Sequence, residues 1–108
     1  MKIDSKGFIT DFLEYIKTER RFSQHTIRAY AFDLNKFEKF LRYYDQNICI
    51  NDIDTSALQF YIQSLSKIGL EGKSIQRKVS TIKSFYKFLT EKDIIAYNIA
   101  DLIQIPKA

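Results

Sequence analysis

The sequence predicts an all-α fold: a compact four-helix domain with a small fifth C-terminal helix. Helix breakers are scarce, with three glycines and one proline among 108 residues. Four segments repeat apolar residues at helical spacing, which is the main signal for amphipathic helices. The hydrophobic content of 45%, with nine Phe and seven Tyr, is typical of a packed interior rather than a disordered chain. A single domain over residues 1–108 is therefore expected.

Composition also bears on the compartment. No apolar run reaches the length of a transmembrane helix, and the beginning of the chain is too polar for a secretory signal. Cys49 is the one cysteine, so no disulfide within the chain can form. These features predict a cytoplasmic protein without membrane contact.

The first helix is predicted from Ser5 to Arg20. Its off-stripe charges are of mixed sign, as on an ordinary solvated face, so we interpret this helix as structural. The apolar stripe comprises Phe8, Ile9, Phe12, Leu13 and Ile16.

The second helix is predicted from Gln24 to Tyr44, with Ser23 as its N-cap. Acidic residues Asp33 and Glu38 are expected at the flanks of its apolar face. The apolar face comprises Ile27, Tyr30, Leu34, Phe37, Leu41 and Tyr44, and the far side carries Arg28, Asn35, Lys36, Lys39 and Arg42.

The first turn of this helix, Gln24, His25 and Thr26, allows two interpretations. Short polar side chains near the positive end of a helix dipole can contact phosphates or base edges. They can equally be ordinary solvated residues, and the sequence favours neither.

A connection from Asp45 to Thr55 leads to a third helix, predicted from Ser56 to Ile68 with Asp54 or Thr55 as its cap. Alternating isoleucines in the connection suggest a short extended segment. Gly69 follows the helix as the expected left-handed C-terminal residue. The apolar positions of the helix are Leu58, Tyr61, Ile62, Leu65 and Ile68.

The fourth helix is predicted from Lys73 to Leu89 and carries the most unusual charge pattern of the chain. No Asp or Glu occurs between Glu71 and Glu91. A face of one sign predicts a negatively charged partner, and a phosphate backbone is the commonest one. The five cations are Lys73, Arg77, Lys78, Lys83 and Lys87, and the apolar side comprises Ile75, Val79, Ile82, Tyr86 and Leu89 with Phe85 at its edge.

After Leu89, a small helix is expected near Asn98 to Ile103, followed by an extended exit at Ile105, which precedes Pro106.

Catalytic and metal-binding patterns are missing from the sequence. His25 and Cys49 are the one His and the one Cys, and no zinc, P-loop or nucleophile-elbow spacing occurs. Tyrosine nucleophiles would need an activating Arg, Lys and His set that this chain does not supply. The sequence therefore predicts no catalytic residues, no metal, no cofactor and no small-molecule substrate.

Binding remains as the predicted function. In the major groove, Gln pairs with adenine and Arg with guanine, while Lys and Arg neutralise phosphates. A helix from Lys73 to Lys87 is about 21 Å long, which suits a groove crossing. One alternative is a cationic face without a partner. Another is a helix that lies on a membrane surface, which is disfavoured because the apolar side of the helix is needed for the protein core.

Several segments together resemble the N-terminal core-binding domain of tyrosine recombinases, the phage-integrase and Xer-like family. The segment SQHTIRAYAFDLNKFEKFL matches the family pattern through Ser23, Thr26, Tyr30, Asp33, Leu34 and Phe37. The segment SIQRKVSTIKSFYKFL matches a later box through Arg77, Lys78, Ser80, Lys83, Ser84, Phe85 and Tyr86. Asn98-Ile99-Ala100 and Ile105-Pro106-Lys107 complete the resemblance, with Ile99 standing where proline is usual.

The resemblance implies a SAM-like integrase N-terminal fold that binds double-stranded DNA and forms half of a clamp around a recombination site. The second and fourth helices of that family cross the major groove. The DNA-binding residues that it implies are Ser23, Gln24, His25, Thr26, Arg28, Lys73, Gln76, Arg77, Ser80, Lys83, Ser84 and Lys87.

It also implies that residues 104–108 begin a linker to a catalytic domain, so that the chain is a fragment without strand-cleaving activity of its own. Sister protomers are the implied protein partners, and the first helix is the element suspected of contacting them. The alternative function is a helical protein–protein interaction module that docks an acidic partner or a sister subunit.

Overall fold

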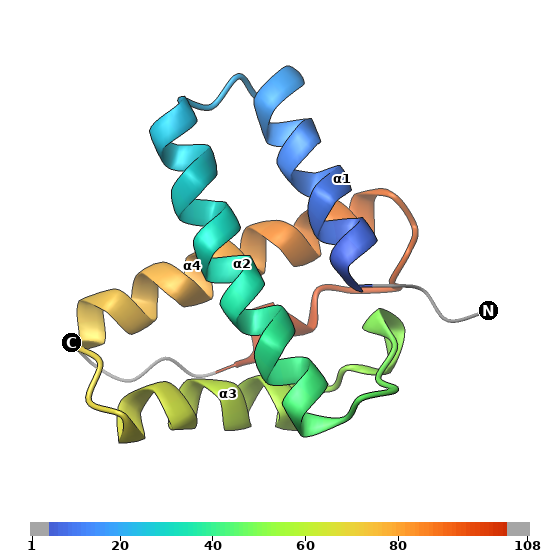
Figure 1. Cartoon of the computed structure of the whole chain (residues 1–108). Coiled ribbons are helices and arrows are strands. Elements are labelled where there is room, and N and C mark those ends of the chain that lie inside the picture. Colours follow the sequence, from blue (N-terminus) through green and yellow to red (C-terminus); the bar gives the residue numbers. More distant parts are fainter. Residues whose placement is uncertain (1–4, 104–108) are drawn as a thin grey trace. The chain divides into compact units, whose positions relative to one another are not determined.

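The computed structural model describes residues 5–103, and over these residues it is all-α (Figure 1). The chain divides into two compact units, one ending at Ile50 and one beginning at Asn51. Within residues 5–103 the four α-helices follow one another in the predicted order, with a short 3-10 helix after the second α-helix and another after the fourth.

The first unit is built on α1 (Ser5–Thr18) and α2 (Gln24–Tyr44), which pack side by side and run in opposite directions (Figure 1). The predicted apolar stripe of α1 is largely buried, with Ile9, Phe12 and Ile16 at its centre. Phe12 stacks on Tyr30 of α2, with ring centroids 6.1 Å apart. Aromatic stacking therefore holds the two helices together in addition to the burial of apolar area.

The corner between α1 and α2 is longer than predicted, because α1 ends at Thr18 and not at Arg20. Arg21 adopts the left-handed conformation (φ 53°), and the Phe22 N–H donates to the Ile16 carbonyl at 2.9 Å. The Phe22 and Tyr30 rings meet edge to face, with centroids 5.8 Å apart. These contacts fix where α2 begins.

Ser23 caps α2 as predicted. Its hydroxyl accepts from the Thr26 N–H at 3.2 Å and also bonds the Thr26 hydroxyl at 2.9 Å. One otherwise unpaired donor of the first turn is thereby satisfied. The predicted bounds of α2 are confirmed, although Tyr44 is half exposed rather than part of the buried face.

The predicted extended connection is wrong, because Ile50–Asp52 forms the 3-10 helix η1. The isoleucines of this connection, Ile48, Ile50 and Ile53, are nevertheless buried as their pattern suggested. A 3-10 turn can bury them as well as a strand can, since short apolar runs do not distinguish the two.

The second unit contains α3 (Thr55–Lys67), α4 (Gly72–Glu91) and η2 (Ile99–Leu102). Asp54 is the cap of α3, and its carboxylate accepts from the Ala57 N–H at 2.9 Å. Ile68 lies beyond the helix and is exposed, unlike the other predicted apolar positions.

The chain reverses between α3 and α4 through Gly69, whose φ of 89° confirms the predicted left-handed residue. The Gly69 N–H donates to Ser66 and the Leu70 N–H to Leu65, so two terminal carbonyls of α3 are satisfied. Every residue predicted for the apolar side of α4 is buried, and Phe88 joins them.

The small fifth helix exists as η2, which packs against α3 and α4. Asn98 ties it down: the side-chain amide donates to the Lys83 carbonyl at 3.2 Å, and its oxygen accepts from the Ala100 N–H at 3.0 Å. The predicted exit at Ile105–Pro106 and the predicted linker 104–108 lie outside the described residues.

Candidate nucleic-acid interface

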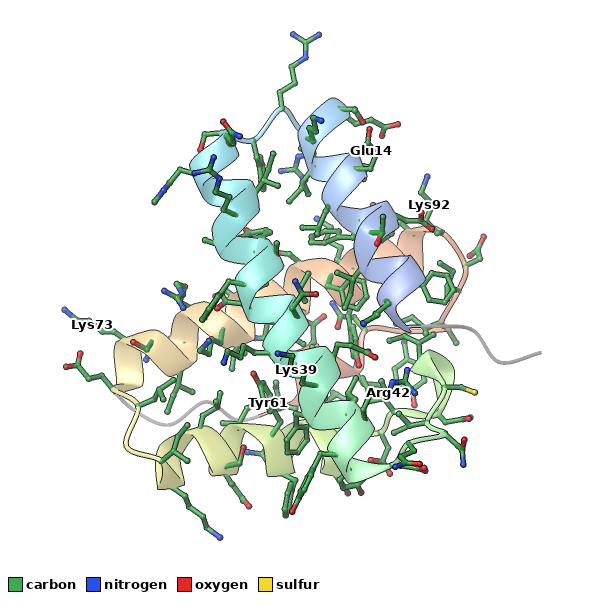
Figure 2. The ribbon with its side chains drawn as sticks, viewed as in Figure 1. Glu14, Lys39, Arg42, Tyr61, Lys73 and Lys92 are labelled. Atoms are coloured by element: carbon green, nitrogen blue, oxygen red, sulfur yellow. The ribbon has the colours of Figure 1, made fainter. Side chains whose placement is uncertain are left out.

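The outer side of α4 carries the cations that the sequence singled out. Lys73, Arg77 and Lys87 are exposed, and Lys83 is half-buried. Lys73 projects away from the N-terminal end of the helix (Figure 2). The neutral candidates lie among these cations, with Ser80 exposed and Gln76 and Ser84 half-buried. All seven predicted residues of this helix therefore reach the surface.

Lys78 does not belong to this face. It is 7% exposed and lies on the packed side of α4, so four of the five cations counted in the segment lie on the outer side, the same four that were predicted to bind DNA. Helical spacing agrees with this separation, because adjacent residues differ by about 100° around the axis, which puts Arg77 nearly opposite the apolar stripe and Lys78 beside it.

The two ends of the α4 face differ in charge. Lys83, Ser84 and Lys87 line a hollow of about 360 Å³, and Glu91 and Asp101 line the same hollow. Asp101 belongs to η2, which the sequence places far from the basic segment. Two carboxylates thus offset two ammonium groups at the C-terminal end of the helix, and the strongest positive field is expected around Lys73 and Arg77.

The candidates at the start of α2 are also accessible. Ser23, Gln24, His25 and Arg28 are exposed, and Thr26 is half-buried. The Ser23 and Thr26 hydroxyls are engaged with each other in the cap, so the S-x-x-T pattern has a structural role whether or not DNA binds. The side chains of Gln24, His25 and Arg28 make no hydrogen bond or ion pair with the residues that the structure describes.

Further along α2, the cationic far side is smaller than predicted. Arg42 donates from Nε to Glu38 Oε1 at 2.6 Å and from a terminal nitrogen to the Gln46 carbonyl at 2.9 Å. Arg42 is therefore a structural residue. Glu38 and Asp33, which were expected at the flanks, are buried.

Lys36 and Lys39 remain exposed on this side, and the Lys36 ammonium lies 5.5 Å from the centroid of the Phe32 ring. A cation over an aromatic ring is held by the ring quadrupole. This contact orients Lys36 but leaves its charge at the surface. The sequence did not select these two lysines as candidates, because the family pattern does not include them.

The described residues bear on three further functions: metal binding, membrane crossing and nucleophilic chemistry by a tyrosine. They contain no group of three or more His, Cys, Asp and Glu side chains that could hold a metal ion. In the same part of the chain, no helix is long and apolar enough to cross a membrane. Burial raises the pKa of the Tyr86 phenol far above its usual value, so this hydroxyl stays protonated and is a poor nucleophile.

Comparison with known proteins matches residues 9–93 of the chain to a family model described as the phage integrase N-terminal SAM-like domain. The chain is 35% identical over 99 residues to tyrosine recombinase XerC of Lacticaseibacillus casei, covering 92% of this chain and 33% of the relative. It is 34% identical over 105 residues to XerC of Bacillus subtilis, covering 94% and 33%.

A third relative, tyrosine recombinase XerD of Rickettsia prowazekii, is 37% identical over 100 residues, covering 93% of this chain and 32% of the relative. The chain thus spans about a third of the length of the curated relatives that it matches. No solved structure gives a significant match.

Proposed function

Because this chain belongs to the family of phage-integrase N-terminal SAM-like domains, we propose that it binds double-stranded DNA as the core-binding domain of a site-specific tyrosine recombinase. The proposal includes a single functional domain over residues 1–108, a catalytic domain supplied by further sequence, and sister protomers as protein partners. A cytoplasmic location follows from the same proposal.

The observation that carries the proposal is the outer side of α4. Lys73 and Arg77 are exposed there, and residues 72–90 contain no acid. Solvated helices usually mix signs, because pairs of opposite charge four residues apart stabilise them. A row of cations with no acid between them in the helix is suited to phosphates, with Gln76 and Ser80 between Lys73 and Lys83 able to meet base edges.

The start of α2 supplies the second contact region in this proposal. Gln24, His25 and Arg28 are exposed and unengaged by the described residues. Ser23 and Thr26 contribute mainly by holding the first turn in place.

Salt dependence tests the proposal directly. Four or so neutralised phosphates predict that log K for a DNA duplex falls with log salt at a slope of about −4. The measurement is fluorescence anisotropy with a labelled duplex over a series of salt concentrations. Binding that does not change with salt would contradict a phosphate-dominated interface.

Reversing the charge of two cations on the outer side of α4 tests whether this face binds the DNA. In the variant R77E/K83E, binding should be lost while the fold persists, because neither residue is fully buried. The matched control is K67E/K92E, which changes the net charge equally at two exposed lysines outside the proposed face. R77E alone serves as a second variant, since Lys83 is half-buried. If R77E/K83E binds no worse than its control, the face is misassigned.

A helical protein-interaction module is the alternative function. Exposed aromatic side chains favour it, with Tyr43 88% and Phe60 51% exposed. Such side chains are enriched at protein interfaces. Nuclear magnetic resonance shifts at α4 on adding DNA support the first function, whereas shifts only on adding a protein partner support the second.

A further inference from the structure

A hollow at the α1–α2 corner brings together residues that the sequence assigns to different roles. It measures about 440 Å³ and lies wholly within the first unit. Two of the residues that line it, Gln24 and Arg28, belong to the proposed DNA interface. The described residues that line it are Lys17, Phe22, Gln24, Ile27 and Arg28.

Lys17 is the unexpected member, because the pattern of α1 marks it only as part of a solvated face. It occupies the last turn of α1, and the corner that follows returns the chain so that the first turns of α2 lie beside it. Proximity of these two segments depends on the turn at Arg21 and Phe22, whose backbone is fixed by the hydrogen bond to Ile16.

Each polar side chain that lines the hollow has a donor that suits an anion. Lys17 and Arg28 are cationic, and Gln24 offers an amide N–H. No carboxylate occurs among the described residues that line it, in contrast to the hollow beside η2 with Glu91 and Asp101. The side chains of Lys17, Gln24 and Arg28 form no hydrogen bond or ion pair with any described residue, so their donors are available.

The apolar part of the lining has a fixed geometry. Phe22 is half-buried and packs perpendicular to the Tyr30 ring, and the Arg20 guanidinium lies 5.2 Å from the Phe22 ring centroid. Ile27 is half-buried beside it. An apolar floor beneath cationic and amide donors is complementary to a deoxyribose ring that carries a phosphodiester group.

We propose that this hollow seats one sugar–phosphate unit of the DNA backbone, with Lys17 as a phosphate-contacting residue alongside Gln24 and Arg28. The inference rests on the proposed DNA-binding function and extends the interface from α2 onto the end of α1. Its effect is on affinity and register rather than on sequence choice, because phosphate contacts carry no direct base information.

The test compares the salt dependence of duplex binding for the whole chain and three variants. In K17Q, one phosphate contact is lost, so the slope of log K against log salt should fall in magnitude by about 1. K17R keeps the charge and should retain the wild-type slope. The matched control is K6Q, an exposed lysine of the same helix that does not line the hollow.

Two outcomes overturn the inference without touching the proposed function. In one, K17Q has the slope of wild type and of K6Q, while R77Q lowers it. In the other, K6Q lowers the slope as much as K17Q, which would show a general charge effect. If wild type itself shows no salt-dependent binding, both the inference and the proposed function fail.

A second measurement does not depend on any variant. Adding the DNA duplex to the wild-type chain should shift the nuclear magnetic resonance signals of Phe22 and Ile27, which line the hollow. Adding inorganic phosphate alone separates a small-anion site from a DNA contact. Shifts with phosphate but none with DNA would overturn the proposed occupant.

Discussion

Arg42 shows how a single partner changes what a residue can do. By spacing it belongs to the cationic far side of α2, but it pairs with Glu38 and holds the Gln46 carbonyl. Its guanidinium therefore stabilises the end of the first unit and is not free to bind an external anion. The Glu38 side chain is only 4% exposed, so the pair neutralises a charge that would otherwise be buried alone.

Removing the guanidinium should therefore destabilise the protein. We expect R42M to lose about 2 kcal/mol of unfolding free energy, less than for a fully buried pair because the Arg42 side chain is 35% exposed. The double variant E38M/R42M should recover most of this loss, since no charge is left to bury. Urea unfolding measures both variants.

The control for this pair is K39M, which removes an exposed cation from the same helix and should change stability by less than about 0.5 kcal/mol. Figure 2 shows Lys39 and Arg42 on α2. Equal stability of R42M and K39M would mean that the ion pair contributes nothing.

At the scale of the helix, the caps determine where each element begins and ends. Ser23 starts α2 and Asp54 starts α3 through side-chain hydrogen bonds to the backbone, and Gly69 ends α3 in the left-handed conformation. α4 lacks a side-chain cap at Glu71. Its stability depends more on its long buried side, which the sequence shows clearly.

Substitution of Ser23 separates its capping role from any contact with DNA. We expect S23A to lose about 1 kcal/mol of unfolding free energy, whereas S23N should lose little, because Asn is as good a cap as Ser. Thermal and urea unfolding test this pair. If S23N is destabilised as much as S23A, the hydrogen bond to the Thr26 N–H is not what stabilises the helix start.

The DNA affinities of the two folded variants then show whether the Ser23 hydroxyl also contacts DNA. A cap-only role predicts that S23N binds like wild type. Weaker binding by S23N at unchanged stability would indicate that the Ser23 hydroxyl contacts the DNA itself.

At the scale of the whole chain, each compact unit is small. The units comprise residues 1–50 and 51–108, lengths at which a hydrophobic core is marginal without disulfides or metals. The proposal of a single domain therefore predicts one cooperative unfolding transition for the chain.

Native-state amide hydrogen exchange checks this prediction. The most protected amides of α2 and those of α4 should open with the same free energy and respond equally to added urea. Two separate opening free energies, or R42M destabilising only the first unit, would show that the units unfold independently.

Charge is also organised at the scale of the fold. The basic segment of the sequence is uniform, yet in the second unit Asp101 lines the same hollow as Lys83 and Lys87. In the first unit, Lys17 comes beside Arg28. The positive charge at one end of the α4 face is thereby partly offset, and the start of α2 gains a neighbouring cation.

The helices, their order and most of the core were predictable from the sequence, because helical periodicity and caps are local properties of the chain. The bounds of α2, the cap at Ser23, the left-handed Gly69 and the buried side of α4 were all predicted from residues within one or two turns of each other. The family was also predicted, from the order and spacing of its patterns.

Tertiary structure alone decided which charged residues are available. Arg42 is paired with Glu38, Asp101 offsets the end of the basic face, and Lys17 joins the start of α2. Each of these outcomes depends on how neighbouring elements pack or on a turn that reverses the chain. The sequence by itself thus determined the elements and their cationic character, while packing determined the surface charge, because electrostatic partners are set by distance in space rather than along the chain.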